Sequence, residues 1–115
     1  MNTRVLFAAL CACLLASATA FADEAKGKVT FLTPADGAVV GTNQKFTVSY
    51  EAELGPKGNH LHLYLDDHRL DVLRQVKGSY DVTIGAPGKH EICLEIETNW
   101  HFSTGVRQCL NVTAK

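Results

Sequence analysis

Three histidines carry the residue types and spacing best suited to chemistry in this 115-residue sequence. His60 and His62 lie in the stretch GNHLHLYLDD (residues 58–67), where leucines alternate with polar and aromatic residues. This period-two alternation predicts a strand that places its leucines in a core and both histidines on the opposite face. Two imidazoles so placed are close enough to share a copper or zinc ion. A half-exposed strand that binds no ligand explains the same alternation.

The cysteines set the register of the last two predicted strands. Cys11 and Cys13 fall within a predicted signal peptide, so Cys93 and Cys109 are the remaining pair and are expected to form a disulfide. If they face each other, apolar residues pair with apolar residues and an acid pairs with a base. The resulting pairs are Glu95 with Arg107, Leu94 with Gln108, Ile92 with Leu110 and Ile96 with Val106. The disulfide then lies on the outer face of one sheet and does not join two sheets.

This register leaves residues 98–104 as a hairpin tip that contains Trp100, His101 and Phe102. In an immunoglobulin-like sandwich, the strand that begins at His60 runs antiparallel to residues 90–97. The tip then lies beside the start of that strand, which predicts His101 as a third metal ligand. Trp100 and Phe102 have two interpretations: one of them folds back to plug the end of the sandwich, or they bind a protein or glycan partner.

Short apolar-alternating segments separated by turn signals predict an all-β fold, an immunoglobulin-like antiparallel β-sandwich of about seven strands. Residues 68–76 (HRLDVLRQV) fit a single helical turn, a short strand with a bend, or an irregular crossover. Asp66, Asp67, His68 and His90 form a weaker polar cluster, expected at the end opposite the three histidines and interpreted as solvated.

The first residues have the pattern of a secretory signal peptide. Arg4 precedes the apolar residues 5–16, and an Ala-Phe-Ala cleavage site ends at Ala22. We therefore expect a signal peptide over residues 1–22, a loose lead-in over 23–28 and the sandwich over 29–115, in the periplasm or secreted. A retained N-terminal anchor is the alternative. The net charge of −1 is not basic enough to predict a nucleic-acid or anionic-lipid partner, and we expect a monomer that is free of the membrane after signal cleavage.

Several short motifs resemble a known group of proteins. They are Gly58-x-His60-x-His62, Asp66-Asp67, Ala86-Pro87-Gly88-Lys89-His90 and Asn99-Trp100-His101. Together they resemble the small secreted bacterial domains designated DUF4399 and DUF6130, which are largely uncharacterised. The resemblance implies an immunoglobulin-like single domain, with His60, His62 and His101 in the functional positions. The sequence departs from that group at Asn59, where a histidine is common, and in its Cys93–Cys109 pair.

The sequence thus supports a small binding protein whose partner is a copper or zinc ion at His60, His62 and His101. The alternative is an interaction module that uses Trp100 and Phe102. No catalytic triad, carboxylate pair or phosphate-binding glycine loop is recognisable, so we expect no enzyme activity.

Overall fold

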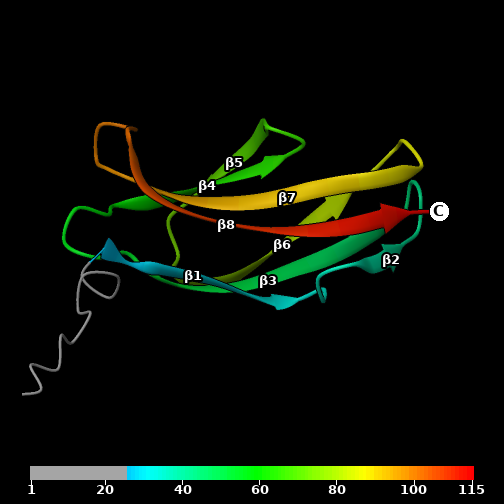
Figure 1. Ribbon diagram of the computed structural model, residues 1–115, viewed down its shortest axis with the longest axis horizontal. Helices are drawn as coiled ribbons and strands as arrows, with labels where there is room; N and C mark the ends of the chain where they lie inside the picture. The colour runs from blue at the N-terminus through cyan, green and yellow to red at the C-terminus, as the bar shows by residue number, and fades with distance from the viewer. Residues whose placement is uncertain (1–25) are drawn as a thin grey trace, which may run out of the picture.

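The computed structural model describes residues 26–115, which form two β-sheets packed face to face (Figure 1). The smaller sheet has the strand order β1-β3-β6 and the larger sheet has the order β2-β8-β7-β4-β5. The strands are β1 Lys28–Thr33, β2 Ala38–Val40, β3 Lys45–Glu53, β4 His60–Leu65, β5 His68–Leu73, β6 Lys77–Thr83, β7 Gly88–Glu97 and β8 Ser103–Ala114. The predicted all-β sandwich is confirmed. The predicted signal peptide, residues 1–22, lies outside the described residues.

Strand β4 lies between β7 and β5 in the larger sheet, and its leucines alternate into the core as predicted. Leu61 and Leu63 are completely buried. They pack with apolar residues of β7 and β8 and with residues of the opposing sheet, among them Val48, Tyr50, Val82, Ile92, Leu94, Ile96, Leu110 and Val112. The leucines of β4 therefore fix which face of this strand the histidines occupy.

The predicted register of β7 and β8 is correct from Gly88 to Glu95 and then shifts. Cys93 faces Cys109 and Glu95 faces Arg107, but Glu97 faces Ser103. The expected pairing of Ile96 with Val106 is therefore wrong. Gly105 adopts a φ of +89°, and the Thr104 hydroxyl donates to the Ile96 carbonyl at 2.8 Å, so extra residues of β8 bulge out of the ladder at this point.

The segment after residue 67, for which the sequence allowed three conformations, forms a strand. Residues 68–73 are β5, which pairs antiparallel with β4 at the edge of the larger sheet, so the helical-turn interpretation is wrong. A tight turn at Asp66 and Asp67, both with positive φ, reverses the chain directly into β5. Pairing with β4 satisfies the backbone better than one helical turn could.

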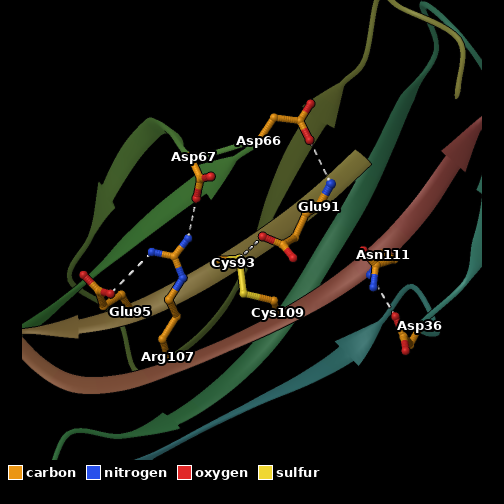
Figure 2. The surroundings of a disulfide bond; sticks show 9 residues. All are labelled: Asp36, Asp66, Asp67, Glu91, Cys93, Glu95, Arg107, Cys109 and Asn111. Atoms are coloured by element: carbon orange, nitrogen blue, oxygen red, sulfur yellow. Dashed lines mark hydrogen bonds and ion pairs between the residues drawn. A yellow bond between two sulfur atoms is a disulfide. The ribbon is translucent and has the colours of Figure 1, made fainter. Parts of the chain in front are cut away.

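The disulfide joins Cys93 of β7 to Cys109 of β8 within one sheet, as expected (Figure 2). The same outer face carries Arg107, which bonds Asp67 at 2.9 Å and Glu95 at 3.4 Å. The Arg107 guanidinium also lies 4.9 Å from the centre of the Tyr64 ring. Arg107 of β8 therefore contacts residues of β4, of β7 and of the turn after β4 on this outer face. Among residues 26–115, no helix is long and apolar enough to cross a membrane.

Candidate metal centre

His60 and His62 lie on the outer face of β4, yet both side chains are buried. Their exposed fractions are 1% and 3%. Across the ladder, Glu97 of β7 faces His60 and Glu95 faces His62, so acidic side chains flank the imidazoles on one side. The interpretation of this strand face as half-exposed is therefore wrong for the two histidines.

His101 reaches these two residues from the hairpin tip between β7 and β8, which lies at the same end of the molecule as the start of β4 (Figure 1). The tip is closed by backbone hydrogen bonds from Thr98 to the Phe102 carbonyl and from His101 to the Thr98 carbonyl. His101 itself has a φ of +63°, in the left-handed region. Its side chain therefore does not follow the alternation of side chains between the two faces of the hairpin. The predicted convergence of the three histidines is present in the structure.

Three ring nitrogens form a nearly equilateral triangle. His60 Nε2 lies 3.0 Å from His62 Nε2 and 3.1 Å from His101 Nδ1, and the third side, from His62 Nε2 to His101 Nδ1, is 3.2 Å. A hydrogen bond between two ring nitrogens needs a proton on one and a lone pair on the other. Each nitrogen either carries a proton or has a free lone pair, so at least two of the three nitrogens are alike. Two like nitrogens cannot hydrogen-bond to each other, so hydrogen bonds cannot account for all three contacts. A cation that accepts three lone pairs can.

The outer nitrogens of both strand histidines face oxygen atoms, and for His60 the partner is an amide oxygen that can only accept. His60 Nδ1 donates to Asn59 Oδ1 at 2.9 Å, so its Nε2 carries the lone pair. His62 Nδ1 lies 3.4 Å from the Tyr64 hydroxyl and 3.5 Å from Glu97 Oε1. Metal-binding histidines are typically oriented by such contacts to the other ring nitrogen.

Burial keeps the two strand histidines neutral. Burial lowers the pKa of His60, and the positive charges of His101, Arg74 and Arg69 lower it further. Burial also lowers the pKa of His62, with a smaller contribution from His60. Neutral imidazole is the form that binds metal, so no proton has to leave these two residues at neutral pH.

Glu97 is a buried acid that the sequence analysis did not single out. Burial, with a hydrogen bond to Glu95 and the charge of Glu95, raises the pKa of Glu97 to about 8. Glu97 is therefore largely protonated at neutral pH, and its contact with His62 joins two neutral groups. Its position opposite His60 follows from strand pairing, which only a known β4–β7 register could have shown.

The triangle has the dimensions of a three-coordinate face. Nitrogens 3.0–3.2 Å apart can all bind one ion at the metal–nitrogen distance of about 2.0 Å, so His60, His62 and His101 would hold the ion together. His60, His62 and His101 are the only histidines of the described chain that converge in this way.

The second polar cluster lies at the other end of β4 and does not form a comparable site. Asp66 forms a hydrogen bond with His90. Asp66 also accepts a hydrogen bond from the Glu91 backbone, and Asp67 accepts one from Arg107 (Figure 2). His68 is exposed at the start of β5. These two carboxylates therefore hydrogen-bond to neighbouring strands and stabilise the strand ends.

Trp100 and Phe102 flank His101 and point into solvent, with exposed fractions of 77% and 70%. The interpretation that one of them plugs the sandwich is wrong, because the tip hydrogen-bonds to itself instead of folding back. The exposed aromatic pair therefore borders the three-histidine triangle.

No protein-family model and no curated protein matches the chain. Among solved structures, fibronectin type III-like modules of Clostridium thermocellum CbhA superimpose with a TM-score of 0.64 and 16% identity, over 76% of this chain and 96% of theirs. The CARDB domain of a Pyrococcus furiosus protein, in solution, gives a TM-score of 0.53 at 11% identity, over 77% of this chain and 94% of the domain. A crystal structure of that CARDB domain in complex with di-metal ions gives 0.54 at 11% identity, over 78% and 86% of the two chains.

These likenesses define the fold class as an immunoglobulin-like β-sandwich, as predicted. At such identities they establish the fold and leave the chemistry to the residues of this chain.

Proposed function

We propose that this protein is a periplasmic or secreted, non-catalytic metal-binding domain that holds one transition-metal ion through His60 Nε2, His62 Nε2 and His101 Nδ1. The observation that carries the proposal is the triangle of ring nitrogens with sides of 3.0–3.2 Å. The CARDB domain crystallised with two metal ions supports the idea that a sandwich of this class can carry metal.

The donor set favours copper, with zinc as the second choice. Three imidazoles without a thiolate suit Cu(II) and Zn(II), and Cu(II) binds nitrogen sites more tightly than Zn(II) does. The disulfide removes both cysteines of the described chain from metal binding. No methionine occurs after Met1, so a thioether copper site is not available there.

The test is a calorimetric titration of the protein with Cu(II) and with Zn(II), together with the electron paramagnetic resonance spectrum of the copper form. The wild type should bind one equivalent and show coupling of the copper signal to nitrogen. His101→Ala removes an exposed tip residue and should lose tight binding without loss of fold. His68→Ala, which removes an exposed histidine of β5, is the matched control and should bind as the wild type does.

Equal and weak binding by the wild type, His101→Ala and His68→Ala would contradict the proposal. A His60→Ala/His62→Ala double variant removes the two proposed ligands on β4 and extends the test to them. Circular dichroism verifies its fold, because both residues are buried.

The exposed aromatic pair favours a second candidate function, a protein- or glycan-binding module. Large aromatic side chains exposed at the tip of a rigid hairpin are typical of binding anchors. Pull-down from periplasmic or cell-surface extract tests this: Trp100→Ala/Phe102→Ala should lose a partner that the wild type retains. Identical recoveries would count against this function.

A further inference from the structure

The two disulfide-bonded cysteines are held side by side by the sheet as well as by their own bond. Cys93 of β7 directly faces Cys109 of β8, and their Cα atoms are 4.1 Å apart. This short spacing is typical of a facing pair that exchanges no backbone hydrogen bonds, in which the side chains lie closest. The ladder is regular on both sides of the pair, from Gly88 to Glu95 of β7. The strand pairing would therefore keep two thiols together if the disulfide were reduced.

Glu91 directs a carboxylate oxygen at this disulfide. Its Oε1 atom lies 3.3 Å from Cys93 Sγ (Figure 2). A disulfide sulfur carries no proton, so this contact is not a hydrogen bond. Arg107 on the same face bonds two other carboxylates, and among residues 26–115 no basic side chain, the nearby Lys89 included, lies within ion-pair distance of Glu91. The Glu91 oxygen and both sulfurs lie within 4.8 Å of one another.

Two thiolates and a carboxylate are a donor set that suits zinc. Zinc binds cysteine sulfur at about 2.3 Å and carboxylate oxygen at about 2.0–2.2 Å. One zinc ion can therefore bind two sulfurs up to about 4.6 Å apart, a separation that facing cysteines meet once their sulfurs are no longer bonded to each other. Without a cation, the reduced pair and Glu91 would place three anionic ligands together, and a divalent ion removes most of that repulsion.

We propose that reduction of the Cys93–Cys109 disulfide creates a second metal site, in which the two thiolates and the Glu91 carboxylate bind one zinc ion. It shares no ligand with the three-histidine triangle and does not depend on copper binding there. Bound zinc would also protect the two thiols from reoxidation, because both sulfurs are then occupied.

The reductant is an external dithiol. Its first thiolate attacks the sulfur of Cys109, which is half-buried, whereas Cys93 is only 1% exposed. A mixed disulfide forms at Cys109 and Cys93 leaves as a thiolate. The second thiol of the reductant then releases Cys109 and closes the reductant's own disulfide, so the two electrons and two protons come from the dithiol. Zinc binding displaces the two thiol protons to solvent.

The test is a titration with Co(II), which replaces zinc and gives a thiolate-to-cobalt charge-transfer band in the ultraviolet. The protein is His101→Ala, which lacks one histidine of the triangle, either oxidised or reduced with a phosphine that adds no competing thiol. The reduced protein should show the band, saturating at one equivalent, and added zinc should abolish it. The oxidised protein should show no band. Cys93→Ser/Cys109→Ser in the same background should show none either.

Glu91→Gln in the reduced protein should weaken Co(II) binding by about tenfold or more, since it removes a ligand and not only a contact to one. Glu95→Gln is the matched control, because it removes the acid two residues beyond Cys93 on the same strand face, whose carboxylate bonds Arg107. It should bind Co(II) as the parent does.

A reduced protein that keeps the circular dichroism of a β-sheet but shows no thiolate band would overturn the proposal. Unfolding on reduction would overturn it as well, since the ladder would then not hold the thiols together. Equal affinities of Glu91→Gln and Glu95→Gln would overturn the three-ligand site. None of these outcomes affects the proposed histidine site, which the oxidised wild type tests.

Discussion

The three histidines differ in how the chain holds them. His60 and His62 are buried on a central strand, where neighbouring strands and the core leucines fix the backbone. His101 is exposed on a hairpin tip, and a single left-handed residue conformation directs it toward the strand. Two of the proposed ligands are thus positioned by the sheet and the third by a turn, so the turn is the part of the proposed site that can adjust.

The side-chain amide of Asn59 orients one of the proposed ligands, His60. Asn59→Ala removes the acceptor for His60 Nδ1, so the His60 ring loses its preferred tautomer and orientation. We expect Cu(II) affinity to fall by about tenfold or more, as is typical when such a contact to a metal-binding histidine is lost. Calorimetric titration measures the change. Asn111→Ala on the exposed face of β8 should bind copper normally, and equal affinities of the two variants would contradict the assignment.

The Asp66–His90 pair makes stability depend on pH. The hydrogen bond to Asp66 raises the pKa of His90. Burial acts to raise the pKa of Asp66, but the bonds from His90 and the Glu91 backbone lower it overall. The His90 contribution is complete below its unfolded pKa and lost at higher pH, and the Asp66 contribution is complete above its unfolded pKa and lost at lower pH.

The stabilisation by this pair should therefore be greatest between about pH 4 and pH 6.5. We expect His90→Ala to lower the free energy of unfolding most within that window and less at pH 8 and above. Urea denaturation across the pH range measures this dependence. Lys89→Ala, at the adjacent exposed position, should not reproduce the pattern; a constant difference between the wild type and His90→Ala would refute it.

At the scale of the elements, the β7–β8 hairpin both positions His101 and carries the bulge that sets its tip. Gly105→Ala forces a Cβ onto a residue with a φ of +89°, where no atom lies within 4 Å of the new methyl, so conformational strain is the whole effect. We expect a loss of about 1 kcal/mol in stability, together with weaker copper binding as the tip shifts.

Gly37→Ala is the natural comparison, because its φ is +82° and its surroundings are equally open. It lies before β2, which pairs with the far end of β8, so it should lose similar stability and keep copper affinity. Chemical denaturation and calorimetry separate the two effects. Equal copper affinities in both glycine variants would show that the bulge does not control the site.

The same hairpin shows how far sequence reasoning reaches. The cysteine pair correctly set the strand pairing up to Glu95, because side-chain complementarity there reflects direct contact. The predicted pairing was wrong at Ile96, because the bulge there depends on the backbone conformation of Gly105, which side-chain complementarity does not specify. The histidine convergence followed from topology, but burial of Glu97 and exposure of Trp100 depend on how a tip closes on itself.

At the scale of the whole molecule, a bound ion would link β4 to the hairpin tip across 41 residues of chain, from His60 to His101. An ion that binds only the folded protein stabilises it by about 2.7 kcal/mol at a free concentration of 100 times Kd. We expect Cu(II) to raise Tm, and EDTA to reverse the rise. The Tm of His101→Ala should not respond to copper, and a response equal to that of the wild type would place the ion elsewhere.

The alternation within β4 has a consequence for the fidelity of folding. Shifting this strand by one residue against β7 would exchange the two faces, placing His60 and His62 in the apolar core and Leu61 and Leu63 outside. Such misregistered chains could not assemble the triangle of nitrogens with His101. If the proposed metal site is correct, the copper bound per molecule would then measure the fraction of refolded protein in which β4 has paired in the correct register with β7.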